Sequence, residues 1–203
     1  MLRKYKKLRK SGVYPDLAGY EAVLNAVQAQ KVGASADKVI LDMLASPPEG
    51  GLTLAHAKQA LGACAAASRP QEALAVLTAM DAADMEGDLE CFSLAMQACV
   101  FAPNKLPIED LARQVMRKVK AAKTKVMLDG NYYGLLLQVL VRARKYKEAV
   151  ACFEVLSLDN NFKPSDEHYY AAMKAATALK DQVLLNNWPR RVCYVTLILG
   201  DCV

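Results

Sequence analysis

The most constraining feature of this 203-residue sequence is an acidic and aromatic pair that returns along the chain. Four aspartates are each followed, four residues later, by an aromatic side chain: Asp16 and Tyr20, Asp88 and Phe92, Asp129 and Tyr133, and Asp166 and Tyr170. An aspartate at a helix start accepts hydrogen bonds from free backbone N–H groups and faces the positive end of the helix dipole. The aromatic side chain then lies one turn into the helix, where it packs on a neighbour. The pattern predicts a new helix after each aspartate.

The intervals between these helix starts predict repeats of about 35 residues. Gly62-Ala63-Cys64 matches Gln97-Ala98-Cys99, which lies 35 residues further on, and this match places one more boundary near Thr53. The second helices also match, because Gln71-Glu72-Ala73-Leu74 corresponds to Lys147-Glu148-Ala149-Val150. The predicted repeats are 17–53, 54–88, 89–129 (with an enlarged turn at 102–107) and 130–166, preceded by an incomplete repeat at 1–16 and followed by a partial repeat at 167–187 and an irregular apolar tail at 188–203.

The hydrophobic pattern predicts an all-α protein. Tyr20, Val23, Leu24 and Val27 fall on one stripe of a helix. Each predicted helix is short, and short helices are marginal unless neighbours cover their apolar stripes. Much of the 54% hydrophobic content is alanine, which favours close helix packing. We therefore expect an α-solenoid of helix–turn–helix repeats, with about four and a half repeats.

Several function classes find no support in the sequence. The chain has no phosphate-cradling glycine loop and no nucleophile motif, so we do not expect an enzyme or a small-molecule substrate. Its six cysteines and two histidines show no zinc-ligand spacing, so we expect neither a metal nor another cofactor. No apolar run is long enough for a transmembrane segment. The net charge of +5 permits an anionic partner without requiring one.

The signatures resemble the pentatricopeptide repeat family. The matching pieces are the boundary at Gly12–Asp16, the tyrosine early in the first helix, the Glu-Ala of the second helix, and the late Met43 and Met80. The resemblance implies a right-handed superhelix whose first helices line a groove. It also implies an organelle, mitochondrion or chloroplast, and single-stranded RNA bound at one base per repeat.

In that family two residues of each repeat read a base, namely the residue after the aromatic position and the last residue of the repeat. The resemblance assigns these base-reading pairs: Glu21 with Thr53, Lys58 with Asp88, Ser93 with Asp129, and Gly134 with Asp166. Only Ser93 with Asp129 has the short polar side chains that suit a base edge. The pairs therefore argue against tight, sequence-specific RNA recognition.

Clusters of basic residues are candidates for contacts with phosphate groups. One cluster lies on a predicted second helix and contains Arg113, Arg117, Lys118 and Lys120. Another lies at a turn and contains Arg142, Arg144 and Lys145. A third, at the N-terminus, contains Arg3, Lys4, Lys6, Lys7, Arg9 and Lys10. The alternative interpretation is that such residues form a solvated outer face.

Two functions follow from these observations. The first is a non-catalytic organellar binding module that associates with RNA inside a larger ribonucleoprotein-type assembly. The second is a protein–protein scaffold, or accessory subunit, of a large organellar complex with no RNA recognition of its own. The basic clusters favour the first function. The poor base-reading pairs and the apolar tail favour the second.

Overall fold

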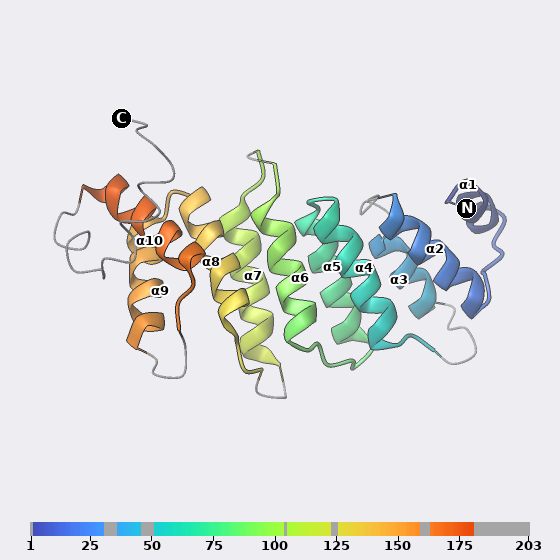
Figure 1. Cartoon of the computed structure of the whole chain (residues 1–203). Coiled ribbons are helices and arrows are strands. Elements are labelled where there is room, and N and C mark those ends of the chain that lie inside the picture. The colour runs from blue at the N-terminus through green and yellow to red at the C-terminus, as the bar shows by residue number, and fades with distance from the viewer. Residues whose placement is uncertain are drawn as a thin grey trace. The chain divides into compact units, whose positions relative to one another are not determined.

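The computed structural model describes residues 2–30, 36–45, 51–103, 105–122, 126–158 and 163–180. These residues form ten α-helices and no strand, so the all-α prediction is confirmed for this part of the chain (Figure 1). The helices are α1 Leu2–Lys10, α2 Leu17–Ala29, α3 Ala36–Ala45, α4 Leu54–Ala66, α5 Pro70–Ala82, α6 Leu89–Val100, α7 Ile108–Ala121, α8 Gly130–Arg142, α9 Tyr146–Leu158 and α10 Asp166–Leu179. The predicted apolar tail at 188–203 lies outside the described residues.

The chain divides into two compact units, residues 1–127 and residues 128–203. In unit 1, helix α4 packs between α2 and α6, and helix α5 packs between α3 and α7. Figure 1 shows these helices following one another in chain order, with α2, α4 and α6 in one row. We call α2, α4, α6, α8 and α10 the first helices, and α3, α5, α7 and α9 the second helices. In unit 2, helices α8, α9 and α10 all pack on one another.

Small side chains let the helices of unit 1 approach closely. Helix α4 buries Ala57, Ala60 and Cys64 completely, together with Leu61. Cys64 and Cys99 occupy equivalent positions of α4 and α6, eleven residues after the helix caps Thr53 and Asp88. Burial raises the pKa of the Cys99 thiol to about 12, so this thiol stays protonated at neutral pH. These cysteines act as small core residues rather than as nucleophiles.

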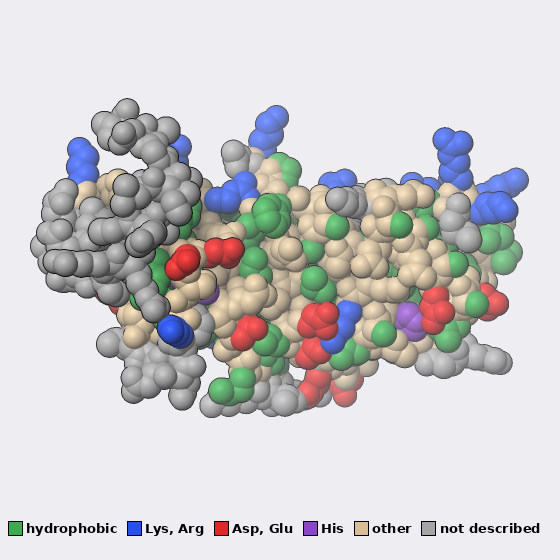
Figure 2. Space-filling model, in the orientation of Figure 1, with side chains coloured by type: hydrophobic (Ala, Val, Ile, Leu, Met, Phe, Trp, Pro, Cys, Tyr) green, Lys and Arg blue, Asp and Glu red, His purple; other side chains and the backbone are tan. Residues whose placement is uncertain are grey.

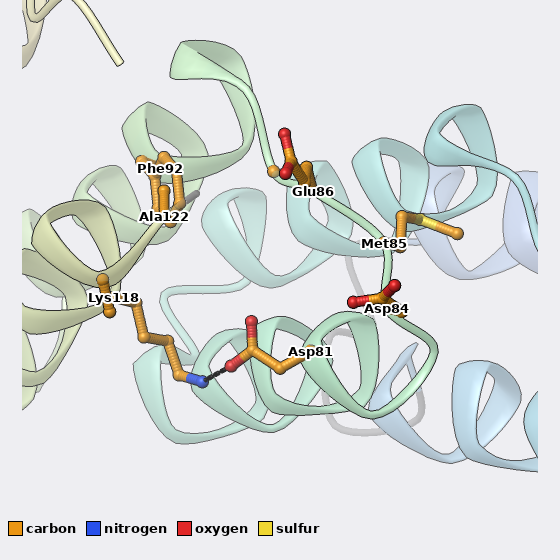
Figure 3. A pocket seen from close by; sticks show the side chains of 9 residues that line it. Asp81, Asp84, Met85, Glu86, Phe92, Lys118 and Ala122 are labelled. Atoms are coloured by element: carbon orange, nitrogen blue, oxygen red, sulfur yellow. Dashed lines mark hydrogen bonds and ion pairs between the residues drawn. The ribbon is translucent and has the colours of Figure 1, made fainter. Parts of the chain in front are cut away.

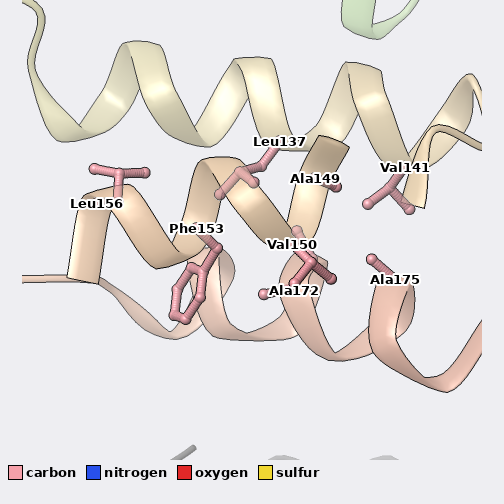
Figure 4. Close-up of a cluster of buried hydrophobic side chains, with 9 residues drawn as sticks. Leu137, Val141, Ala149, Val150, Phe153, Leu156, Ala172 and Ala175 are labelled. Atoms are coloured by element: carbon pink, nitrogen blue, oxygen red, sulfur yellow. The ribbon is translucent and has the colours of Figure 1, made fainter. Parts of the chain in front are cut away.

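Unit 2 has a core of its own, built around an aromatic side chain (Figure 4). Phe153 of α9 is fully buried and meets Tyr169 of α10 edge-on, with 5.1 Å between the ring centroids. Leu137 of α8 and Ala172 of α10 belong to the same cluster. The alanines of α10 leave room for the phenyl ring, so the large and small side chains of neighbouring helices fit together.

The predicted aspartate caps are confirmed at three of four positions. The carboxylates of Asp16, Asp88 and Asp129 accept hydrogen bonds from backbone N–H groups three residues later, at 2.8, 3.1 and 2.8 Å. The prediction for the fourth cap is wrong. Ser165 caps α10, and Asp166 is the first residue inside the helix.

Two predictions about aromatic packing need correction. Tyr170 is 47% exposed, and its neighbour Tyr169 provides the packing contact in α10. This difference follows from the cap, because a start at Ser165 puts Tyr169 four residues later. In α8 the side chain of Tyr132 is fully buried, whereas that of Tyr133 is only half-buried.

One buried carboxylate links helix α1 to α3 within unit 1. Asp42 of α3 is only 5% exposed; it accepts a hydrogen bond from the Tyr5 hydroxyl and pairs with Arg9, whose Nε lies 2.7 Å from Oδ2. Burial, and then the hydrogen bond to Asp42, raises the pKa of Tyr5 above its usual range. A buried charge must be paired, so these contacts fix the place of α1.

Candidate nucleic-acid interface

The base-reading positions of unit 1 lie at the start of the first helices, where each helix meets the next. In the first pair, Glu21 of α2 faces His56 of α4, with 3.5 Å between Oε1 and Nε2. His56 also accepts a hydrogen bond from the backbone N–H of Thr53, the second member of the pair. The histidine therefore stands between the two predicted base-reading residues and contacts both.

The second pair is joined by an ion pair. Lys58 Nζ lies 2.6 Å from a carboxylate oxygen of Asp88 and 2.6 Å from one of Glu90. Hydrogen bonds to Asp88 and then to Glu90 raise the pKa of Lys58 above its usual range. Burial pushes the pKa of Asp88 upward, but hydrogen bonds from Lys58 and from the Cys91 N–H outweigh it, so this pKa is lowered. The lysine is thus already neutralised by carboxylates and is poorly placed to bind a phosphate.

Further along the same face, amide side chains contact one another. Gln59 of α4 donates a hydrogen bond to Asn25 of α2 at 2.6 Å. Gly62, one turn later, brings α4 close to the Gln28 side chain. Figure 2 shows acidic and basic side chains beside one another on the face that carries α4 and α6. Several polar groups of this face are therefore engaged with each other.

The third pair is divided between the units. Ser93 of α6 is half-buried in unit 1. Asp129 is the cap of α8 in unit 2, where its carboxylate is occupied by the Tyr132 N–H. Asp129 therefore has a structural role as a helix cap whether or not RNA is present.

The fourth pair lines a hollow of about 690 Å³ between α8 and the start of α10. Gly134 lies on one side of the hollow, and Ser165 and Asp166 on the other. A Cβ atom on Gly134 would come within 3.2 Å of Nε2 of His168, so glycine permits the close approach of this ring. The structure therefore brings Gly134 and Asp166 to one site, with a histidine at its wall.

The predicted phosphate-contact residues of α7 are exposed to different degrees. Arg113 pairs with Glu109 one turn earlier at 2.8 Å, and Lys118 reaches Asp81 at the end of α5 (Figure 3). That contact borders a hollow of about 200 Å³ whose other carboxylates are Asp84 and Glu86. Arg117 and Lys120 are both exposed on the same helix. Acidic neighbours therefore weaken this cluster as an anion site.

The basic turn after α8 is exposed. Arg142 is the last residue of α8, and Arg144 adopts a left-handed backbone conformation with φ of 58°. The side chains of Arg142, Arg144 and Lys145 are all open to solvent to a large degree. The left-handed conformation is costly for a residue other than glycine, so this turn presents its cations at some conformational cost.

Helix α1 carries the densest positive charge in the described part of the chain. Six of its nine residues are Lys or Arg, all six are exposed, and none of the nine is acidic. Within the described residues, Arg9 is the one cation of this helix that pairs with a carboxylate, that of Asp42. The electrostatic potential around this helix is therefore positive, and its charged side chains are exposed to solvent.

His56 and His168 are the residues that the sequence reasoning missed. Their spacing argues against a zinc site, yet each is the third residue of a first helix, where it closes a capping box. The signal was present in Thr53-Leu-Ala-His56 and Ser165-Asp-Glu-His168, which have capping-box spacing with histidine in the position usually held by Glu or Gln.

Among the described residues, no group of three or more His, Cys, Asp or Glu side chains is arranged to hold a metal ion. None of the helices in the described ranges is long and apolar enough to cross a membrane. The residues described thus define an all-helical protein of paired helices. No protein-family model matches the chain, and no curated protein is significantly similar to it.

Proposed function

We propose that this chain is a non-catalytic helical-repeat module of the pentatricopeptide kind, which associates with RNA inside a larger organellar ribonucleoprotein assembly. The packing in unit 1 supports the repeat architecture, because α2, α4 and α6 pack in sequence and so do α3, α5 and α7. Such rows are what a right-handed α-solenoid requires. The organelle and the family rest on the sequence resemblance.

The RNA is bound through its backbone rather than read through its bases. Glu21 contacts His56, Lys58 is held by two carboxylates, and the His168 ring lies against Gly134. The observation that carries the proposal is helix α1, with six exposed cations and no acidic residue. Lysine and arginine that neutralise phosphates give binding that depends on salt and tolerates any sequence.

The test is binding of an unstructured 20-nucleotide oligouridine to the purified chain over a range of salt concentrations. We expect affinity to fall steeply with salt. The charge reversals Lys4→Glu, Lys6→Glu and Lys7→Glu together should lower affinity at least tenfold and flatten the salt dependence, by about 0.7 in log–log slope for each phosphate that is no longer neutralised. These three positions leave Tyr5, Arg9 and their contact with Asp42 in place.

Single reversals provide a matched control. Lys6→Glu on α1 and Lys174→Glu on α10 both reverse the charge of an exposed helical lysine. The proposal requires the α1 variant to bind RNA more weakly than the α10 variant. Absence of binding at about 25 mM salt, or equal losses in the two variants, would rule out α1 as the RNA contact.

A specific observation supports the second function, a protein–protein scaffold. On the face formed by the first helices of unit 1, side chains contact one another. Lys58 forms ion pairs with Asp88 and Glu90, and Gln59 donates a hydrogen bond to Asn25. Polar groups that already bond to one another cost little free energy when a protein partner buries them. If this function holds, chemical cross-linking of the native assembly should place a protein on α2, α4 and α6. The triple reversal in α1 should then leave assembly intact.

A further inference from the structure

Helix α1 is held on unit 1 by few side chains. Tyr5 alone of its nine residues is buried, with 4% exposure, and its ring meets the fully buried Tyr20 of α2 edge-on, with 6.5 Å between the ring centroids. The Tyr5 hydroxyl donates a hydrogen bond to Asp42 of α3, and Arg9 Nε lies 2.9 and 2.7 Å from the two oxygens of that carboxylate. Within the described residues, both side chains that pair with Asp42 come from α1. The polar part of this docking therefore rests on one carboxylate.

The sequence of α1 opposes its own helix. Its nine residues are fewer than the roughly 12–15 that an isolated helix needs to be even marginally stable in water. Cations recur at three- and four-residue spacing, as in Arg3, Lys7 and Lys10, and like charges at these spacings repel one another on a helix. Arg3 and Lys4 in the first turn also oppose the helix dipole, and no acidic residue lies there to offset them. The helix should therefore need docking, neutralisation of its charges, or both.

We propose that the docking of α1 on Asp42 and the binding of RNA by α1 are coupled, so that each makes the other more favourable. This inference rests on the proposed function, in which the cations of α1 contact phosphate groups. Phosphates neutralise the cations and remove the repulsion that opposes the helix, which is the form that docks. Docking in turn holds the cations in place, so fewer side chains must be ordered when RNA binds. Asp42 is thus a positioning residue for an RNA contact that it does not itself make.

The charge of Asp42 gives this inference a sharp test. The carboxylate is negative and lies beside the cations of α1, so on charge alone its removal should strengthen the binding of an anion. The coupling predicts the opposite result. Without the carboxylate, Tyr5 and Arg9 lose their common partner, and α1 is docked in a smaller fraction of the molecules. Asp42→Asn keeps nearly the same shape, so the sign of the change in affinity decides between the two expectations.

The first measurement is amide hydrogen exchange of residues 6–10, followed by NMR without RNA. Asp42→Asn should speed this exchange at least about tenfold, the typical worth of a hydrogen bond to a charged group, and should leave exchange in α6 unchanged. Tyr5→Phe preserves every charge and should speed it by a smaller factor, about threefold. The matched control is Asp110→Asn, at an exposed acid in the first turn of α7, which should not alter exchange in α1. Unchanged exchange of residues 6–10 in Asp42→Asn would overturn the inference.

The second measurement is the affinity of the same variants for the 20-nucleotide oligouridine at low salt. Asp42→Asn should bind about fivefold more weakly than the wild type, because fewer molecules have α1 docked. Asp110→Asn should bind as tightly as the wild type or slightly more tightly. The log–log salt slope of Asp42→Asn should match that of the wild type, since all six cations of α1 are retained. By reciprocity, saturating oligouridine should slow exchange of residues 6–10 in the wild type.

The inference and the proposed function fail in different ways. If the wild type binds oligouridine and Asp42→Asn binds it equally well or better, the coupling is overturned and the proposed function stands. The same holds if bound oligouridine leaves exchange in α1 unchanged. If the wild type binds no oligouridine at low salt, the proposed function fails and the coupling fails with it.

Discussion

The first helices meet in different ways in the two units. In unit 1 the contacts between first helices involve charged side chains. The Glu21 carboxylate faces His56, and Lys58 is held by Asp88 and Glu90. In unit 2 the corresponding histidine contacts a backbone carbonyl, and a glycine stands where unit 1 has Glu21. Both positions lie five residues after a helix cap, Asp16 or Asp129.

The difference shows that one capping device serves two kinds of helix contact. The cap fixes the ring, and the residue on the preceding helix decides whether the contact is electrostatic or steric. Glu21 reaches His56 through its long side chain, whereas Gly134 has no side chain and lets the His168 ring approach the backbone of α8. Salt should therefore weaken the contacts between first helices in unit 1. In unit 2 the contact should depend more on the volume of the side chains that meet there.

The largest expected effect tests whether each unit depends on its own core. Phe153→Ala removes a fully buried ring from unit 2, and Leu61→Ala truncates a fully buried side chain in unit 1. Each should cost about 3–5 kcal/mol of unfolding free energy, from the forfeited transfer energy and the cavity left behind. Hydrogen exchange should show Phe153→Ala releasing the amides of α8–α10, and Leu61→Ala those of α4–α6.

Val155→Ala is the control, because Val155 lies on the same helix as Phe153 but is 70% exposed. It should change stability by less than about 0.5 kcal/mol. If Phe153→Ala accelerated exchange in α4–α6 as much as in α8–α10, the two units would unfold together, and the comparison between them would lose its basis.

A glycine substitution in each unit tests the steric contact. Alanine in a helix interior is normally more stable than glycine by about 1 kcal/mol. Gly62→Ala should show most of this gain, since its Cβ would meet Gln28 at an ordinary 3.5 Å. Gly134→Ala should show none of it, because its Cβ would press on the His168 ring at 3.2 Å and the ring is held by its contacts with Ser165 and Gly130.

Urea unfolding of the two single variants measures this difference. Combining Gly134→Ala with His168→Ala should restore the gain, which a double-mutant cycle would report as coupling. If Gly134→Ala stabilised the protein as much as Gly62→Ala, the result would show that the His168 ring moves aside easily.

The sequence predicted the caps better than the contacts, for a physical reason. Asp16, Asp88 and Asp129 act on their own helix within three residues, so a local pattern reveals them. At the fourth boundary two adjacent residues can both cap, and His168 selects Ser165 because it completes the box from three residues further on.

The contacts of Lys58 and Gly134 involve partners that lie about one repeat away in the chain. Lysine often binds phosphate groups, but the charge of Lys58 is neutralised by Asp88, thirty residues later. The repeat pattern makes Gly134 a base-reading position without a side chain, yet the structure brings His168 against it. Only the placement of neighbouring helices reveals such contacts.

A smaller effect concerns the left-handed residues that end first helices in both units. Ser68 follows α4 with φ of 56°, and Arg144 follows α8 with φ of 58°. Ser68→Gly and Arg144→Gly should each stabilise the chain by about 0.5–1 kcal/mol, because glycine adopts this conformation without strain. Only Arg144→Gly removes a cation, so it alone should weaken oligouridine binding. Equal RNA affinity in the two variants would exclude Arg144 as a phosphate contact.

The smallest effect tests the electrostatic side of the comparison. Lys58→Gln removes a partly exposed ion pair and should cost only about 0.5 kcal/mol at low salt. About 0.5 M salt should reduce this cost to nearly zero, because exposed charges are screened. The cost of His168→Gln should change less with salt, since Nε2 of His168 contacts the neutral carbonyl oxygen of Gly130 on α8. Urea unfolding of both variants at low and high salt measures these costs. If the cost of His168→Gln depended on salt as strongly as that of Lys58→Gln, charge would also govern the helix contact in unit 2.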